Sequence, residues 1–201
     1  MTAVLDAVRA HVRAHFAARG LDSEPDSASV TFLGVERMDV LRFGPIDGLL
    51  HHVSLGCARH PMGDPAAAAV DPVRGPRAEL VLTVRDTVPT PGLARTVAIL
   101  AATPAVDGIV LRPDALIDLG APLWQRPAGL PPLSAVVLTD GAIPDLELGE
   151  PYDPVTFLAA TPISANEAAW ARLKGVDALR EAWQQDGVDV TDPQRVAKQP
   201  S

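Results

Sequence analysis

The chain has 201 residues, of which 47% are hydrophobic and 4% aromatic, and its formal net charge at pH 7 is −8. This composition supports an aliphatic core, and the acidic balance argues against a nucleic-acid partner, which requires clustered Lys and Arg. Cys57 is the single cysteine, no run reaches the length of a membrane span, and the N-terminus lacks a signal-peptide pattern. The abundance of Ala, Pro, Gly and Arg is typical of high-GC bacterial genes. We therefore expect a cytoplasmic bacterial protein without a membrane partner.

The first part of the chain predicts a helix followed by a β-meander. Residues 2–19 place apolar side chains on one helical face, and Gly20 suits the helix end. A polar segment, residues 22–29, then leads into the strands. Residues 58–76 are rich in Pro, Ala and Gly without periodicity, which predicts a long surface loop. Turn residues separate three short apolar runs that predict the meander, at residues 30–35, 38–43 and 49–56.

The middle of the chain predicts two strands covered on both faces. Residues 78–84 and 133–139 are near-continuous apolar runs of strand length. Residues 93–102 show helical spacing, which we expect to end before Pro104. A weak strand is expected at residues 145–148.

Residues 155–183 carry the clearest local pattern. Both faces of residues 155–161 are apolar, which predicts a central strand that Pro162 ends. Ser164 and Glu167 match a capping box at the start of a helix. Gly175 is expected to kink that helix or split it in two. The apolar face of the helix comprises Trp170, Leu173, Val176, Leu179 and Trp183, and Phe157 and Trp170 are predicted core residues.

These elements predict one α+β domain over residues 1–185, with a mixed, largely antiparallel sheet flanked by helices. From residue 186 onward the apolar period ends. Residues 186–201 are therefore expected to form a mobile C-terminal tail.

One cluster of metal-ligand residue types suggests a metal-dependent enzyme: His51, His52, Cys57 and His60. A zinc site needs three or four such ligands at one point. His51 and His52 are adjacent on an expected strand, so they point to opposite faces and at most three of the four residues converge. Buried histidines and an inert cysteine are the alternative, and a Cys57–His thiolate pair is a weaker one. We expect no bound metal or cofactor.

Four carboxylates form a weak candidate set for acid–base chemistry, and solvated strand ends are the alternative. They are Glu79, Asp86, Asp118 and Asp140.

Trp124 lies in a Pro-rich loop without helical or strand periodicity. It is either a staple that holds this loop or an anchor for a partner. Trp124, Asp118 and Asp140 are therefore the candidate partner-binding residues.

The order of motifs resembles the Suppressor of fused family. RAELVLTVRD, LARTVAILA, LIDLGAPL and LSAVVLTD follow one another, and VTFLAATPISANEAAWARLKGVDALREAW closes the series. The resemblance covers residues 50–183 and implies an α+β domain that binds proteins rather than catalyses a reaction. The animal member grips an extended peptide between two domains, and this chain is similar only to the first of them. Bacterial single-domain relatives include immunity proteins against toxins.

The leading hypothesis is therefore a non-enzymatic protein-binding module, and specifically an immunity protein that neutralises a basic toxin domain. Complementary charge would accelerate that encounter. Binding would use strand addition at a sheet edge, or the loops around Trp124 and Asp140. The alternatives are the metal-dependent enzyme and a regulatory scaffold unrelated to toxins. The oligomeric state is not indicated by the sequence.

Overall fold

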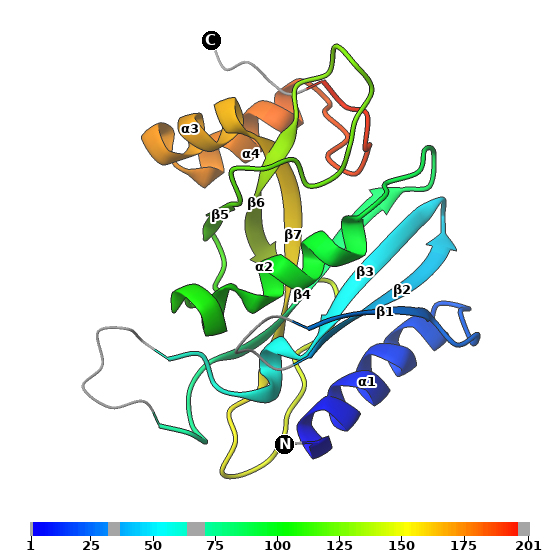
Figure 1. Cartoon of the computed structure of the whole chain (residues 1–201), viewed down its shortest axis with the longest axis vertical. Coiled ribbons are helices and arrows are strands. Elements are labelled where there is room, and N and C mark those ends of the chain that lie inside the picture. Colours follow the sequence, from blue (N-terminus) through cyan, green and yellow to red (C-terminus); the bar gives the residue numbers. More distant parts are fainter. Residues whose placement is uncertain (1, 32–36, 64–70, 197–201) are drawn as a thin grey trace.

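A computed structural model describes residues 2–31, 37–63 and 71–196, and it shows one seven-stranded sheet with helices on both faces (Figure 1). The strands lie in the order β1-β2-β3-β4-β7-β6-β5. β4 and β7 pair in parallel, and every other neighbouring pair is antiparallel. The expected α+β fold with a mixed, largely antiparallel sheet is confirmed.

The elements are α1 (Thr2–Ala17), β1 (Asp26–Val30), β2 (Met38–Ile46), β3 (Leu49–Leu55), the 3₁₀ turn η1 (Cys57–Arg59), β4 (Arg77–Arg85), α2 (Leu93–Asp107), β5 (Leu116–Asp118), β6 (Leu133–Asp140), β7 (Val155–Ser164), α3 (Ala165–Lys174) and α4 (Val176–Gln185). None of the helices in the described residues is long and apolar enough to cross a bilayer.

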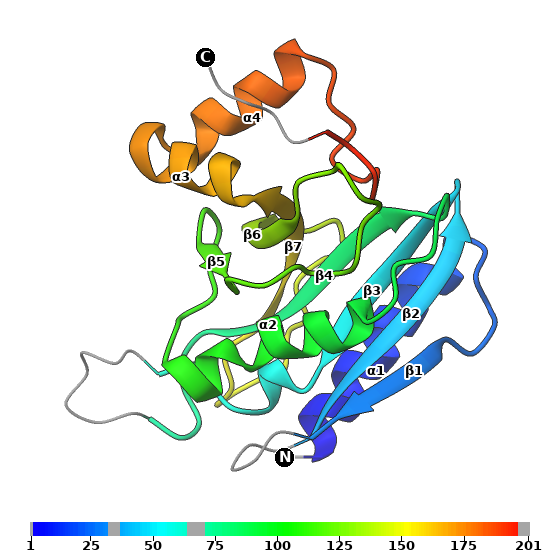
Figure 2. The same ribbon diagram turned by 45° about the horizontal axis from the view of Figure 1, so that its top comes forward.

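Alternate side chains of the strands pack into hydrophobic clusters on opposite faces of the sheet. Val81 packs in a cluster with Phe16 of α1, whereas Leu82 packs in a cluster with α2. In β6, Leu138 belongs to the α2 cluster and Val137 to a third cluster beneath α3 and α4. Helices α1 and α2 therefore lie on opposite sides of the sheet (Figure 2), and the pair α3–α4 covers the face opposite α2.

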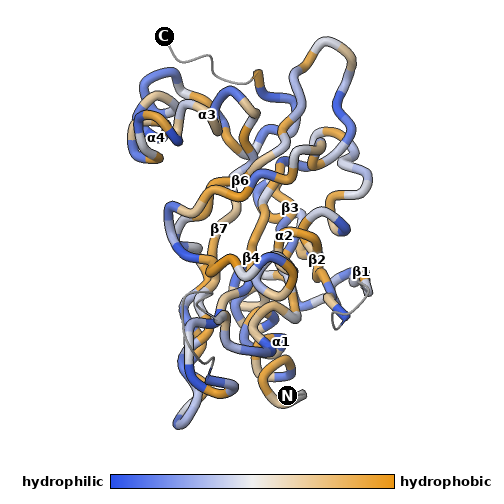
Figure 3. Tube along the Cα trace, turned by 60° about the vertical axis from the view of Figure 1, so that its left-hand side comes forward, coloured by the Kyte–Doolittle hydropathy of each residue, from blue (hydrophilic) through white to orange (hydrophobic). Residues whose placement is uncertain are grey.

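The strands β4, β6 and β7 lie inside the sheet, as their apolar runs predict. β7 lies between β4 and β6, and the hydrophobic colouring along β6 and β7 is visible in Figure 3. Phe157 is 1% exposed, as predicted for a core residue. The strand does not end at Pro162, which pairs with Val136 of β6. The pairing between β7 and β4 stops at Ala159, so the missing N–H of Pro162 falls where β7 has no β4 partner.

Three boundaries differ from those expected. β1 occupies Asp26–Val30 in the polar segment, and most of the apolar run at residues 30–35 lies outside the described residues. α2 continues through Pro104 to Asp107, and Gly108 ends it in the left-handed conformation. The weak strand at residues 145–148 is reduced to a single bridge, between Leu146 and Val155.

The helices after β7 follow the sequence pattern with one exception. Ser164 and Glu167 form the predicted capping box, and Gly175 separates α3 from α4. Trp170 is partly buried against the third cluster. Leu173, however, is 77% exposed and does not join the core. The split at Gly175 explains this, because each short helix then sets its own apolar face.

The C-terminal segment returns to these helices through a buried ion pair. The side chains of Arg195 and Glu167 are 3% and 0% exposed. Two guanidinium nitrogens of Arg195 donate to the two Glu167 oxygens at 2.7 and 3.0 Å, and the Trp183 indole N–H donates to the same carboxylate at 2.9 Å. Packed chain therefore extends at least to Arg195, within the segment expected as a tail. Residues 197–201 lie outside the described residues.

Candidate functional site

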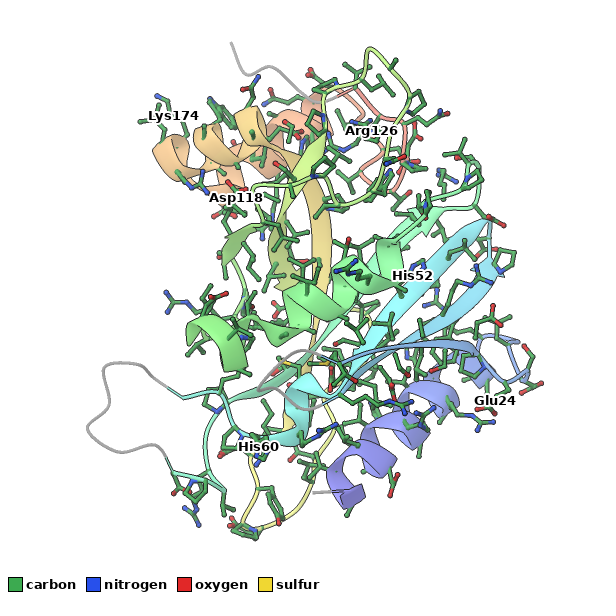
Figure 4. All side chains as sticks on the ribbon, viewed as in Figure 1. Glu24, His52, His60, Asp118, Arg126 and Lys174 are labelled. Atoms are coloured by element: carbon green, nitrogen blue, oxygen red, sulfur yellow. The ribbon has the colours of Figure 1, made fainter. Side chains whose placement is uncertain are left out.

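The four metal-ligand candidates do not form one site. On β3, His51 packs against the Phe16 ring of α1, with ring centroids 5.2 Å apart, and its Nδ1 lies 2.9 Å from the Thr83 hydroxyl. His52 lies on the opposite face, beside α2, whereas His60 lies near η1 (Figure 4). The described residues contain no group of three or more His, Cys, Asp or Glu that could hold a metal ion.

The titration properties of these residues are those of buried groups. Burial lowers the pKa of His51 to about 4 and that of His52 to about 4. Burial, and then the Glu79 carboxylate, raise the pKa of the Cys57 thiol well above its ordinary value. Cys57 is therefore a protonated, packed thiol at neutral pH rather than a nucleophile.

Glu79, near the start of β4, binds the backbone around the η1 turn. Its buried carboxylate accepts hydrogen bonds from the backbone N–H groups of Gly56 and Ala58, at 2.8 and 3.0 Å, and from the Ser54 hydroxyl. Burial raises its pKa, although these hydrogen bonds oppose the shift. Arg77, also buried, donates to the Ala58 carbonyl at 2.8 Å. The two β4 side chains fix the η1 turn, and Glu79 is buried whereas the other three carboxylates of its candidate set are exposed.

The three candidate partner-binding residues lie in three different places. Trp124 is 4% exposed and belongs to the core cluster under α2, which favours the loop staple over the anchor. Asp118 ends β5, and a guanidinium nitrogen of Arg172 donates to it at 3.0 Å. That hydrogen bond, together with one from the Gly120 backbone, holds the Asp118 pKa below its ordinary value.

Asp140 is exposed at the end of β6. Asp118 pairs with Ala135, five positions earlier on that strand. At 3.4 Å per residue the two carboxylates are separated by about 17 Å along the sheet. They therefore mark two patches rather than one.

A cavity of about 630 Å³ opens between the N-terminus of α2 and the sheet face formed by β1, β2 and β3. This volume is within the range of about 300–1,000 Å³ that is typical of ligand sites. Asp26, Arg42 and His52 contribute polar groups from the three strands, and the loop from Asp86 to Gly92 forms the facing wall. Asp26 and Arg42 form an ion pair. The run of residues 49–55 predicts that His51 and His52 face opposite ways, but it does not indicate that α2 leaves space above His52.

The family of this chain follows from its sequence. The sequence profile of the Suppressor of fused protein (SUFU) family matches residues 34–196. The chain belongs to the Suppressor of fused family. No curated protein matches the sequence significantly.

Solved structures of SUFU proteins share the fold. A structure described as a SUFU homologue from Neisseria gonorrhoeae FA 1090 superposes with a TM-score of 0.65 at 16% identity, over 98% of this chain and 97% of that chain. A chain of the Sufu–Fu complex gives a TM-score of 0.65 at 13% identity, over 98% of this chain and 91% of that chain. Drosophila Suppressor of Fused gives 0.63 at 13% identity, over 97% of this chain. This chain spans 49% of the Drosophila chain, about half of its length.

Proposed function

We propose that this SUFU-family chain is a non-enzymatic protein-binding module. The observation that carries the proposal is its membership of the family across residues 34–196. A structural relative with the same fold was solved as part of a protein complex, the Sufu–Fu complex. The Neisseria chain shares this fold over nearly the whole of both chains.

The edges of the sheet offer a mode of binding. β1 is the terminal strand on one side, and among the described residues no strand pairs with its outer edge. Four of its five residues are exposed. The outer edge of β1 therefore presents backbone N–H and C=O groups that no other strand in the described residues uses. An extended segment of a partner, added beside β1, would form main-chain hydrogen bonds with these groups. Exposed Asp140 is a separate candidate contact at the end of β6.

The partner that the charge favours is a basic protein. A net charge of −8 accelerates encounter with a positively charged surface and repels nucleic acid. Within this class we propose an immunity role, in which the chain binds and neutralises a basic toxin domain.

Co-purification from the native host, followed by mass spectrometry, tests the binding proposal. The bait is the full chain, and Asp140→Arg is compared with Asp22→Arg, a matched charge reversal at an exposed site in the α1–β1 connection. A specific partner should be recovered with the natural chain and the Asp22 variant, and less of it with the Asp140 variant. Recovery of no specific protein would contradict the binding proposal, and equal recovery with all three baits would remove Asp140 from the contact.

The immunity role requires a separate experiment with the recovered partner. Expression of a toxin partner should stop growth of cells that lack this chain, and co-expression of the chain should restore growth. A partner that is harmless when expressed alone would contradict the immunity role while leaving protein binding intact.

A further inference from the structure

The interface between α1 and the sheet holds three of the chain's five histidines, namely His11, His15 and His51. The His11 ring stacks on Phe157 of β7, with ring centroids 5.4 Å apart. The rings of His15 and His51 each lie 5.2 Å from the ring of Phe16, which is 1% exposed. Phe16 therefore contacts histidines of both the helix and β3, on the sheet face opposite α2 (Figure 2).

His51 has no acidic neighbour that would stabilise a charged ring. Its strand partners are Phe43 on β2 and Thr83 on β4, and both are uncharged. The groups of α1 and its following turn that act on His51 electrostatically are Arg19 and His15, which are cations when charged. Burial and these two groups lower the pKa of His51 to about 4, so its ring is neutral at pH 7.

The other charged groups on this face do not offset a charge on His51. Arg85 follows Thr83 by two positions on β4, and it forms an ion pair with Asp189. His15 is perturbed in the same direction as His51, because burial and then the Arg19 charge lower its pKa. Protonation of either ring thus adds a positive charge beside an arginine.

Side chains make the contacts that hold α1 on the sheet. The backbone hydrogen bonds of the turn after α1 are internal, as in the bond from Leu21 N–H to the Phe16 carbonyl, and no strand pairs with this segment. His11 Nε2 lies 2.7 Å from the Pro144 carbonyl oxygen, a contact that a protonated ring also makes. Two surface ion pairs stabilise the docking only weakly. They are Arg9–Asp39 and Arg13–Glu24. The helix can therefore leave the sheet without breaking a strand pair.

Acid weakens this docking through His51. When α1 leaves the sheet, His51 becomes solvated and its pKa returns to about 6.5. Because the pKa is lower in the docked state, the docking has its full strength above about pH 6.5 and weakens as the pH falls from there toward 4. Between pH 7 and pH 5, His51 alone raises the opening equilibrium about 20-fold. His15 acts in the same direction.

We propose that α1 is an acid-released cover of the sheet, which detaches when His51 and His15 take up protons. Its release uncovers an apolar surface of the sheet. The residues of that surface are Leu41, Phe43, Val53, Val81 and Phe157. This property belongs to the fold and is independent of which protein the chain binds.

Hydrogen exchange of the full chain at pH 7 and pH 5, measured by mass spectrometry of peptides, tests the proposal. Rates are corrected for the intrinsic pH dependence of amide exchange, so that each segment gives a protection factor. Protection of α1 should fall about 20-fold or more between the two pH values. At pH 5 it should lie below the protection of β6, which pairs with two strands and exchanges by larger openings.

Two neighbouring variants identify the titrating group. His51→Asn keeps a hydrogen-bonding side chain beside Thr83 but takes up no proton, so the fall in α1 protection should lose its His51 contribution. His52→Asn is the matched control. The pKa of His52 is also lowered to about 4 by burial, but its side chain lines the cavity on the opposite face, beside α2. This variant should leave the pH-dependent fall in α1 protection unchanged.

Three outcomes would overturn the inference. Equal protection of α1 and β6 at pH 5 would show that the fold opens as a whole, and unchanged α1 protection between pH 7 and pH 5 would show that acid does not release the helix. A fall that persists in His51→Asn would exclude His51 as the titrating group. A variant that only loosens packing would lower α1 protection equally at both pH values, so the pH dependence separates titration from a structural effect. The first two outcomes are measured on the natural chain and do not require that a variant folds.

Discussion

Replacement of Arg195 by methionine should destabilise the fold strongly. The guanidinium donates to both oxygens of Glu167 and to the Pro162 carbonyl at 2.8 Å, and neither charged side chain is more than 3% exposed. Without Arg195, the carboxylate keeps the Trp183 and Ser164 N–H groups but loses a buried counter-ion that contacts both of its oxygens. Removal of one partner of a buried pair typically costs about 3–5 kcal/mol.

Urea unfolding at pH 7, followed by tryptophan fluorescence, measures the loss of unfolding free energy. Arg180→Met is the matched control, because Arg180 is 29% exposed and pairs at the surface with Asp114 and Asp177. It should cost less than about 1 kcal/mol. The double variant Arg195→Met/Glu167→Gln should recover part of the loss, since it removes the uncompensated charge. A loss for Arg195→Met no larger than that for Arg180→Met would refute the reasoning.

The same variant should show a defined pH dependence. Burial would raise the Glu167 pKa, but the hydrogen bond and charge of Arg195 together with the cap hold it below its ordinary value. The pair therefore stabilises the fold above the ordinary glutamate pKa, and this contribution is lost as the pH falls through the lower, folded-state pKa. In Arg195→Met, the hydrogen bond and the charge of Arg195 no longer oppose the effect of burial, so Glu167 takes up a proton more readily in acid. The difference between natural chain and variant should be largest near neutral pH and should shrink in acid.

Three further predictions concern the core. Trp124→Ala should lower the unfolding free energy by about 3–5 kcal/mol, measured by urea unfolding, because the ring is buried; an unchanged midpoint would contradict that burial. Cys57 in the native protein should react with a thiol reagent far more slowly than in urea. The reason is that burial, and to a smaller extent the Glu79 charge, disfavour the thiolate. Equal rates would show that the thiol is accessible. Gly141→Ala should cost about 1–3 kcal/mol in the same unfolding assay, because a Cβ atom would lie 2.3 Å from the Phe157 carbonyl oxygen, and a neutral effect would contradict this close approach.

The sequence predicted best those features that depend on neighbouring residues. The capping box of Ser164 and Glu167, the break at Gly175 and the covered strand after Val155 are each determined within a few positions. The edge strand β1 was missed because four of its five residues are exposed, so it lacks the apolar alternation that identifies half-buried strands.

Long-range pairing explains the other differences. Glu167 forms its buried ion pair with Arg195, which lies in a segment without apolar periodicity, and no local pattern indicates that this arginine is buried. The cavity above His52 likewise depends on where α2 lies relative to β1–β3, which the spacing of residues within each element does not determine. The Trp124 loop offered two interpretations from sequence, and its contact with the α2 cluster favours the staple.

The parallel pairing of β4 with β7 has a consequence for folding. It joins Arg77–Val81 to Val155–Ala159, whereas the sheet on either side is built from antiparallel neighbours closer in sequence. Pairing of distant segments carries a large loop-closure entropy and is slow to form. The β1–β4 meander and the β6–β7 unit with its helices are therefore expected to gain structure first. The β4–β7 pairing is then expected to form last.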